Sequence, residues 1–546
     1  MKKGVSPSKN TNETTIPSHP RRLSRRQFVQ TGAAAATAFA MAPRFVLGEA
    51  GLAVQDKFEP SWDSLKQYEC PQWFRDAKFG IWACMGPQSV PEFTDWYARF
   101  MYNPQGEFNG WQASKIPHVY NYHVKKYGHP SVFGYKDVIN LFTADKFDPD
   151  RLLDLYARAG AEYFVAMANH HDNFDNWNSK YQPWNSVNVG PKKDLIDMWA
   201  KATRKRGLRF GVSTHTAPAW SWFEPSRGAD VDGPLKGVPY DGNLTKADGK
   251  GKWWEGLDPQ DLYCRPHDPD EGPDEAYIQK YYNRTIDLID NYRPDLVYFD
   301  GGLPFGKTGL EIAAYYYNAN AQWHNGRTEA VINLKGVPED RRNAVVDDIE
   351  RGRSAELDKW PWQTDTCIGG WFYVKGIKYK TPKEVILMLA DIVSKNGNLL
   401  LSIPQRGDGS IDEQELAFLE EMAAWMKVNK EAIFGTRPWT VYGEGPTKIK
   451  GGRFADNDNQ MIYASQDIRF TTKSNVLYAI LLDWPGQQAV VTSLPKTAKL
   501  WFRGIRSVKM LGTTQALKWK QDDKGLTVQM PEKKPCEHAY VLKISG

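Results

Sequence analysis

The stretch Arg293-Pro-Asp-Leu-Val-Tyr-Phe-Asp-Gly-Gly302 decides the fold that this sequence predicts. Leu296–Phe299 is apolar, β-branched and aromatic, which indicates a short buried strand limited by Pro294 before it and by two glycines after it. Asp300 therefore stands at the C-terminal end of a strand. In a parallel barrel these ends form the mouth, where active sites are built. The alternative interpretation is that Asp300 caps the following helix.

The same pattern, an apolar strand that ends in a polar residue, recurs along the chain as far as about residue 430. The strands predicted in this way are Lys78–Gly86, Glu162–Asn169, Arg209–His215, Asp295–Gly302, Ala330–Gly336, Asn343–Gly352, Gln363–Gly370 and Asn398–Gln405. Amphipathic helical stretches separate most of them: Pro149–Ala159, Asp194–Arg206, Glu275–Asn291, Gly309–His324, Pro382–Ser394 and Asp412–Lys430. Alternating strands and helices predict the α/β class with a parallel sheet, here a (β/α)8-like (TIM-type) barrel. The connections after the fifth and sixth strands are too short for a full helix, so we expect a barrel distorted in its second half.

After Lys430 the helical periodicity stops and short alternating strands begin. The predicted strands are Leu477–Asp483, Ala498–Phe502, Leu517–Lys520, Leu526–Met530 and Ala539–Ile544, with a hairpin turn at Asp522–Gly525. We therefore expect a catalytic barrel over residues 51–432 and a C-terminal antiparallel β-sandwich over residues 433–546.

The N-terminal region has the pattern of a targeting segment. Ser24-Arg-Arg-Gln-Phe-Val29 is followed by the small apolar run Thr31–Ala42. Residues 1–50 are thus predicted to be a twin-arginine-type export signal and leader, cleaved near Ala42–Ala50. Such a signal predicts a bacterial protein that is exported folded and is periplasmic or secreted. No later segment is apolar enough to anchor the mature chain in a membrane.

Composition limits the function classes. A chain of 546 residues with 41% hydrophobic residues can bury more than one core. The net charge of +5 comes from 70 basic and 65 acidic residues that are interspersed, which argues against a nucleic-acid partner. The 5 cysteines are an odd number without CxxC spacing, so neither a disulfide framework nor a cysteine zinc site is indicated, and we expect no metal and no cofactor.

Two long insertions are predicted to leave the mouth of the barrel. Pro87–Asp148 follows the first strand, and Glu224–Pro273 follows the third. Long loops without regular structure in a compact domain usually serve as lids or binding loops. For the second insertion the alternative is a solvated surface loop.

Histidines follow the second and third predicted strands. Asn169-His-His-Asp-Asn-Phe174 places His170 and His171 together, and His215 ends the third strand. Adjacent side chains point in different directions, so a metal site using both would need a further ligand. Hydrogen bonding to a polyhydroxylated ligand suits them better, and the alternative is a pair of satisfied buried histidines.

A second carboxylate is predicted at the level of the mouth. The sixth strand ends in Asp347-Asp-Ile-Glu-Arg-Gly352. If Asp300 and Glu350 face each other at about 5–5.5 Å, they form the pair that a retaining glycosidase needs. The alternatives are a structural ion pair of Glu350 with Arg351, or a proton donor at Asp348 or Glu356.

These motifs together resemble the α-L-fucosidases of glycoside hydrolase family 29, over residues 73 to about 415. The resemblance is carried by Lys78–Ile81, Ser89–Pro91, Asp95–Tyr97, His170–Phe174, Trp184–Asn185, Gly190–Leu195, Tyr298–Gly302, Trp362–Ile368, Gly370–Tyr373, Val393–Leu401 and Asp408–Gly409. It implies that Asp300 is the nucleophile and that a β-sandwich follows the barrel. The substrate-binding residues assigned with it are Cys84, Asp95, Trp96, His170, His171, Trp177, His215, Tyr298, Arg351 and Trp371.

The sequence departs from the family pattern at the first strand. The strand usually ends in His-Trp-Gly, whereas this chain has Cys84-Met-Gly86, and Asn173 replaces a usual glycine. A thiol is a weaker donor than histidine, and losing one hydrogen bond to the sugar costs about 1–3 kcal/mol. The alternative is that Cys84 is a small buried apolar residue and that Met85 fills the space of the missing tryptophan. The sequence therefore predicts a retaining exo-α-L-fucosidase acting on fucosylated oligosaccharides or glycoconjugates. A related α-L-glycosidase, for example one acting on α-L-galactosides, and a catalytically weakened glycan-binding protein are the alternatives.

Overall fold

The computed structural model describes residues 57–104, 118–268, 270–456, 462–497 and 504–546. The predicted export signal and the predicted strand Ala498–Phe502 lie outside these residues. Eight parallel strands close into a barrel in sequence order, with β1 paired to both β2 and β8. The strands are β1 (Phe79–Ala83), β2 (Tyr163–Met167), β3 (Arg209–Thr214), β4 (Leu296–Phe299), β5 (Val331–Lys335), β6 (Val346–Asp348), β7 (Trp362–Cys367) and β8 (Gly397–Ser402). The predicted fold class is confirmed.

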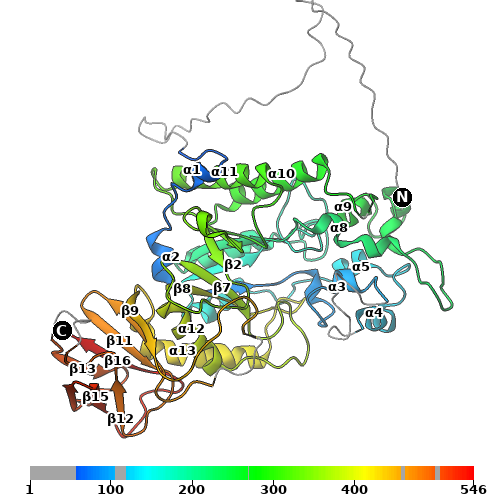
Figure 1. Cartoon of the computed structure of the whole chain (residues 1–546). Helices are drawn as coiled ribbons and strands as arrows, with labels where there is room; N and C mark the ends of the chain where they lie inside the picture. Colours follow the sequence, from blue (N-terminus) through cyan, green and yellow to red (C-terminus); the bar gives the residue numbers. More distant parts are fainter. Residues whose placement is uncertain (1–56, 105–117, 269, 457–461, 498–503) are drawn as a thin grey trace, which may run out of the picture. The chain divides into compact units, whose positions relative to one another are not determined.

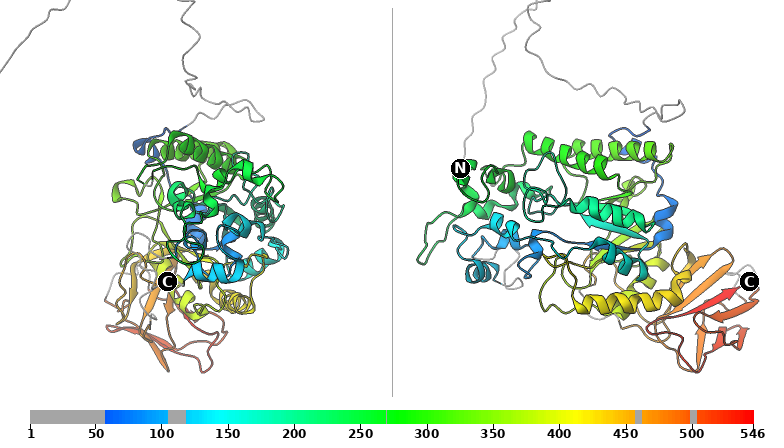
Figure 2. Two further views of the ribbon diagram at one scale, coloured as in Figure 1. Left: turned by 90° about the vertical axis from the view of Figure 1, so that its right-hand side faces the viewer. Right: turned by 180° about the vertical axis from the view of Figure 1, so that it is seen from behind.

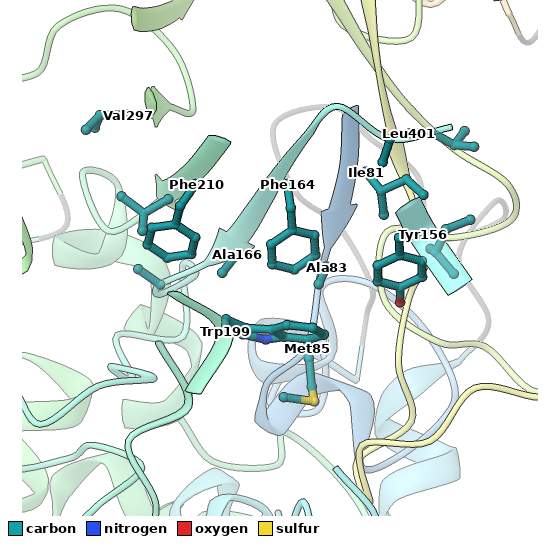
Figure 3. Packing of buried hydrophobic residues seen from close by; sticks show 14 of the residues in the cluster. Ile81, Ala83, Met85, Tyr156, Phe164, Ala166, Trp199, Phe210, Val297 and Leu401 are labelled. Carbon is teal, nitrogen blue, oxygen red and sulfur yellow. The ribbon is translucent and has the colours of Figure 1, made fainter. Parts of the chain in front are cut away.

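The outer surface of the barrel packs against helices. Larger helices lie in the connections between strands and after β8: α6 (Pro149–Arg158), α7 (Leu195–Lys205), α10 (Glu275–Tyr292), α11 (Lys307–Trp323), α12 (Pro382–Ser394) and α13 (Glu413–Asn429). In Figures 1 and 2, α10 and α11 run side by side. In Figure 3 the ring of Phe164 on β2 lies above that of Trp199 on α7 and beside that of Tyr156 on α6, and its centroid is 4.5 Å from that of Trp199 and 6.0 Å from that of Tyr156. This apolar contact fixes the position of β2 and of the loop that follows it.

The inner surface is formed by the alternate residues of each strand, because successive strand residues point to opposite faces. Trp82, Val165, Tyr298 and Leu400 belong to one buried cluster inside the barrel. Gly80 leaves the space for the Tyr163 ring, since a Cβ on this glycine would lie 2.4 Å from that ring. The interior is thus a packed core that supports the mouth from below.

The second half of the barrel is irregular, as the sequence predicts. β5 and β6 are joined by a 3-10 turn, Glu339–Arg341, and within the described residues no helix lies between β6 and β7. The two insertions contain more regular structure than we expected. Short helices lie before β1, between β3 and the second insertion, and within the insertions: α1 (Trp62–Leu65), α2 (Gln72–Ala77), α3 (Tyr97–Phe100), α4 (Val119–Tyr127), α5 (Tyr135–Asn140), α8 (Ala219–Trp222) and α9 (Pro259–Tyr263). These helices are too short to produce a clear periodic signal, and packing against the barrel stabilises them.

After α13 the chain forms two antiparallel sheets. One has the order β13-β16-β11-β10-β9 and the other has the order β12-β15-β14. The strands are β9 (Arg437–Glu444), β10 (Ile468–Lys473), β11 (Val476–Leu481), β12 (Gln488–Val491), β13 (Ser507–Met510), β14 (Trp519–Asp522), β15 (Gly525–Gln529) and β16 (Tyr540–Ser545). The predicted hairpin is present, with Asp522 paired to Gly525. A second apolar core, which includes Phe470 and Val528, lies between the sheets.

A buried ion cluster joins α12 to β10. The Asp391 carboxylate lies 2.6 Å from Nε of Arg469 and 3.0 Å from Nζ of Lys395. All three side chains are at most 4% exposed. Because buried charges are costly without partners, this cluster requires all of its members. Within the described residues no helix is both long and apolar enough to cross a membrane.

Removal of Asp391 should destabilise the protein. Asp391→Ala leaves two buried cations without their carboxylate, so we expect a loss of about 3–5 kcal/mol in the free energy of unfolding. Urea denaturation followed by circular dichroism measures this loss. Asp150→Ala, which removes an exposed partner of Arg206, serves as the control and should leave the transition unchanged. Equal transitions for wild type and Asp391→Ala would contradict the prediction.

Candidate active site

Asp300 continues the inward-facing row of β4. Leu296 and Tyr298 of this strand point into the barrel, and Asp300 is the next residue of the same parity. The strand register pairs Tyr298 with Ser213 of β3 and with Asn333 of β5. The residues two positions further along all three strands therefore lie together at the mouth. They are His215, Asp300 and Lys335.

Lys335 connects two carboxylates at the mouth. Its Nζ lies 2.7 Å from Oδ1 of Asp300 and 3.0 Å from Oε2 of Glu350. The carboxylate of Asp365 on β7 is 3.8 Å away. The two nearest oxygens of Asp300 and Glu350 share one nitrogen, so their separation cannot exceed the sum of these two short distances. This limit is compatible with the carboxyl separation of about 5–5.5 Å found in retaining glycosidases.

Two histidines face Oδ2, the second carboxylate oxygen of Asp300. Nε2 of His171 is 3.4 Å from Oδ2 of Asp300, and Nδ1 of His215 is 3.2 Å from the same atom. Nδ1 of His171 donates to the backbone carbonyl of His215 at 2.7 Å. Burial lowers the pKa of His171 to about 4. A neutral ring with its proton on Nδ1 leaves Nε2 of His171 as a hydrogen-bond acceptor.

His170 has the opposite arrangement. The Gln88 amide lies 2.7 Å from Nδ1 of His170, and Oε1 of Gln88 faces the backbone N–H of Ala98. The amide nitrogen of Gln88 therefore donates to Nδ1, and the proton of the His170 ring is on Nε2. Burial holds the pKa of His170 well below its usual value, so this ring is neutral as well. The two adjacent histidines thus differ: Nε2 of His170 carries a proton, whereas Nε2 of His171, which faces Asp300, does not.

The two mouth carboxylates have opposite pKa shifts. Burial alone would raise the pKa of Asp300, but the Lys335 ammonium and His215 outweigh it and hold that pKa well below its usual range. Burial raises the pKa of Glu350, and the negative charges of Asp365 and Asp300 add to this effect against the opposing Lys335. Asp300 is therefore the ionised member of the pair, and Glu350 is the member suited to carry a proton.

Aromatic rings line the interior beneath these groups. Trp82 of β1 has its ring centroid 5.6 Å from that of His215, 5.2 Å from that of Tyr298 and 5.4 Å from that of Trp371. The hydroxyl of Tyr298 donates to Asp365 at 2.8 Å. Tyr298 is fully buried, so it acts on the site through these contacts.

Several predicted residues support the site from behind. Asp95 accepts a hydrogen bond of 2.8 Å from the backbone N–H of Phe372, directly after Trp371, and burial raises the pKa of Asp95 to about 6. Trp96 packs edge-on against Trp222 at 5.4 Å. Trp222 in turn lies 4.4 Å from the His171 ring. Asp95 and Trp96 of the first insertion therefore contact Phe372 and Trp222, which adjoin Trp371 and His171.

The remaining predicted residues are Trp177, Arg351 and Cys84. Trp177 is fully buried, and its indole donates to Asp287 on α10, so the structure does not place it among ligand-binding residues. Arg351 pairs with Asp456, with its Nε 3.2 Å from the carboxylate. Cys84 lies inside the barrel with 2% exposure, in the cluster against which Trp371 packs. Burial raises the pKa of the Cys84 thiol well above its usual value, so it stays protonated.

The two alternative proton donors are placed less favourably than Glu350. Asp348 precedes Glu350 by two residues on the same inward row, and its side chain is fully buried. It accepts a 2.6 Å hydrogen bond from the Gln363 amide. Glu356 is exposed and interacts with Tyr442. Neither is within ion-pair distance of Lys335.

Sequence reasoning missed three residues of the site: Trp82, Lys335 and Asp365. Lys335 is the last residue of β5. Its place at the C-terminal end of a predicted strand was the sequence signal that could have identified it. Trp82 and Asp365 point into the barrel. Which residues of a strand point inward is known only once the pairing of the strands is known. Among the described residues, no group of three or more His, Cys, Asp or Glu side chains is arranged to hold a metal ion.

A closed parallel barrel with two carboxylates of opposite pKa shift at its mouth, surrounded by aromatic rings and neutral histidines, defines a glycoside hydrolase. Comparison with known proteins agrees. The model of the alpha-L-fucosidase family matches residues 46–431, and the model of the alpha-L-fucosidase C-terminal domain matches residues 459–545. The chain therefore belongs to the alpha-L-fucosidase family. Neither match covers the segment between them.

Similar proteins match over nearly their whole length. The alpha-L-fucosidase of Branchiostoma floridae is 28% identical over 519 residues, which cover 90% of this chain and 96% of that protein. The tissue alpha-L-fucosidase of Rattus norvegicus is 28% identical, with 91% of this chain and 94% of that protein covered. The crystal structure of Thermotoga maritima alpha-fucosidase in complex with fucose is 30% identical, has a TM-score of 0.64, and covers 89% of this chain and 100% of that one.

Proposed function

We propose that this protein is a retaining exo-α-L-fucosidase that releases terminal α-L-fucose from fucosylated oligosaccharides or glycoconjugates. The observation that carries the proposal is the Lys335 ammonium shared by Asp300 and Glu350. It keeps the two carboxylates close together, and in this setting their pKa values shift in opposite directions. The family membership and the fucose-bound structure of the Thermotoga maritima relative support the choice of sugar.

Asp300 acts as the nucleophile in this mechanism. A carboxylate must be ionised to attack the anomeric carbon, and the surroundings of Asp300 lower its pKa. Attack forms a bond between Asp300 and the anomeric carbon while the bond to the leaving oxygen breaks. The product is a covalent glycosyl-enzyme of inverted configuration at that carbon.

Glu350 acts first as the acid and then as the base. In the first step it gives its proton to the leaving oxygen. Once Asp300 is an ester, it no longer carries the negative charge that helps to raise the pKa of Glu350. The pKa of Glu350 then falls, so its carboxylate can take a proton from the water that attacks the intermediate. Two inversions give net retention.

The remaining wall residues fit a sugar ring. Nε2 of His170 donates and Nε2 of His171 accepts, which matches a pair of hydroxyl groups on one sugar. Trp371 is partly exposed and offers an apolar face to the C–H groups of the ring. Cys84 is buried in the cluster against which Trp371 packs, and the proposal includes weaker binding of unmodified fucose than in family members with histidine at this position, because that histidine's hydrogen bond to the sugar is missing.

The place of action is proposed from the sequence. The twin-arginine-type stretch at Ser24–Val29 supports export of the folded enzyme to the periplasm or the medium. A substrate outside the cytoplasm is consistent with a glycan-degrading role. α-L-galactosides, which differ from fucosides by a hydroxyl at C6, remain the alternative substrates.

Hydrolysis by the wild-type chain tests the proposal directly. We expect it to cleave a nitrophenyl α-L-fucoside and to release α-L-fucose first, which proton NMR detects before the anomers equilibrate. Asp300→Asn should lose several orders of magnitude in turnover while still binding fucose. Release of β-L-fucose first would exclude the retaining mechanism. Binding without turnover in the wild type would favour the glycan-binding alternative. Faster cleavage of the matching α-L-galactoside would make the α-L-galactoside the preferred substrate.

Glu350→Ala separates the proton-transfer role from binding. Without its acid the enzyme should lose about 10²–10⁴-fold in turnover on a fucoside with a poor leaving group and far less on a dinitrophenyl fucoside. Azide should restore turnover on the activated substrate by attacking the glycosyl-enzyme in place of water, and the second inversion gives the α-configured fucosyl azide. Equal losses on both substrates without rescue would assign the proton to another carboxyl group, with Asp348→Ala and Glu356→Ala as the comparison variants.

Lys335→Met should change the pH dependence of hydrolysis. The ammonium lowers the pKa of both Asp300 and Glu350, so its removal raises both values. Asp300 then ionises only at higher pH, and Glu350 keeps its proton to higher pH. Both limbs of the kcat/KM profile should therefore move to higher pH. Lys307→Met, which removes an exposed lysine paired with Glu311, is the control. An unchanged profile in Lys335→Met would contradict the assigned electrostatics.

A further inference from the structure

A segment from beyond the barrel in the sequence pairs with the residues around Glu350. The backbone N–H of Phe454 donates to the carbonyl of Glu350 at 2.9 Å, and that of Asp456 donates to the carbonyl of Arg351 at 3.0 Å. Gly452 and Arg353 exchange two further backbone hydrogen bonds of 2.9 and 3.2 Å. Residues 452–456 thus form a short antiparallel pairing with residues 350–353.

The side chain of Asp456 anchors this pairing. It is 2% exposed and accepts a hydrogen bond of 2.6 Å from the hydroxyl of Thr366. Nε of Arg351 and Nζ of Lys380 each lie 3.2 Å from its carboxylate. Arg351 directly follows Glu350, and Thr366 directly follows Asp365. A buried carboxylate with these partners ties the residue that follows the proton donor to β7.

The backbone near Glu350 needs such support. Arg351 has a φ of 45° and Phe454 has a φ of 55°. These left-handed values are uncommon for residues other than glycine and persist only where surrounding contacts impose them. The left-handed residue Arg351 directly follows Glu350, so its conformation helps to set the position of the Glu350 backbone and side chain.

We propose that Asp456 is a positioning residue for the proton donor of the reaction, acting through Arg351 and the backbone of Glu350. The inference rests on the proposed role of Glu350. Asp456 forms its contacts behind Glu350 and takes no part in bond breaking. Its loss lets the loop shift and moves the acid away from the leaving oxygen, while Asp300 stays in place at the end of β4. The defect is then specific to substrates that need protonation.

The test compares leaving groups. For Asp456→Ala, kcat/KM on an unsubstituted phenyl α-L-fucoside should fall by about 10²-fold, with a fall of less than about threefold on a dinitrophenyl α-L-fucoside. Asp456→Asn should lie between this variant and the wild type, because the amide oxygen still accepts from Thr366 but lacks the charge. Azide should accelerate Asp456→Ala on the activated substrate.

A matched control separates positioning from stability. Asp391 is also buried and also binds one arginine Nε and one lysine Nζ, but it lies between α12 and β10. Asp391→Ala should be less stable than the wild type and should show the wild-type dependence on leaving group. Assays are run at a temperature where circular dichroism shows every variant folded. If Asp456→Ala does not fold, Asp456→Asn and Thr366→Val decide by the same comparison.

Glu350→Ala in the same series distinguishes two kinds of failure. If Glu350→Ala shows no selective loss on the poor leaving group, the proposed acid is wrong. If Glu350→Ala is selective, but the Asp456 variants are slowed equally on all substrates or not at all, the positioning role of Asp456 is overturned. Selective loss in both supports the proposal.

Discussion

The ammonium group of Lys335 lies among three carboxylates, those of Asp300, Glu350 and Asp365, and the rest of the site depends on this imbalance of charge. One cation in a largely buried place cannot compensate three anions. The shortest contact goes to Asp300, which keeps its charge, while Glu350 has a raised pKa. The barrel supplies the burial that makes these electrostatic effects strong, and the register of β4 and β5 supplies the distances.

The barrel interior beneath the site is not uniform. Its first strands place Trp82, Val165 and Leu296 inside, so that half is apolar. On its last strands, Asp348 and Asp365 occupy inward positions, and burial with the neighbouring Asp365 charge raises the pKa of Asp348. The apolar half forms a rigid floor under the histidines. The polar half lies beneath Glu350, where it adds negative charge near the residue that must hold a proton.

Much of the fold was predictable from the sequence, and the site was predictable in part. Each barrel strand has a run of apolar residues between polar or glycine limits, so its position is local information. Asp300 was found because it ends such a run. Lys335 and Trp82 were missed because their importance depends on strand register and on partners far away in the chain. Trp177 was assigned through a resemblance, but its burial against Asp287 comes from the packing of α10. Contacts between residues far apart in the sequence are what local patterns lack.

The pairing of residues 452–456 with residues 350–353 limits how the barrel and the C-terminal sheets can be exchanged between homologues. The sheets after the barrel look like an attachable module, yet the segment between β9 and β10 pairs with the chain at Glu350. A chimera that joins one relative's barrel to another's C-terminal part would pair a foreign segment with the chain around the proton donor. The two parts are therefore expected to be inherited together, and exchange between homologues should succeed only when residues 452–456 and residues 350–353 are matched to each other.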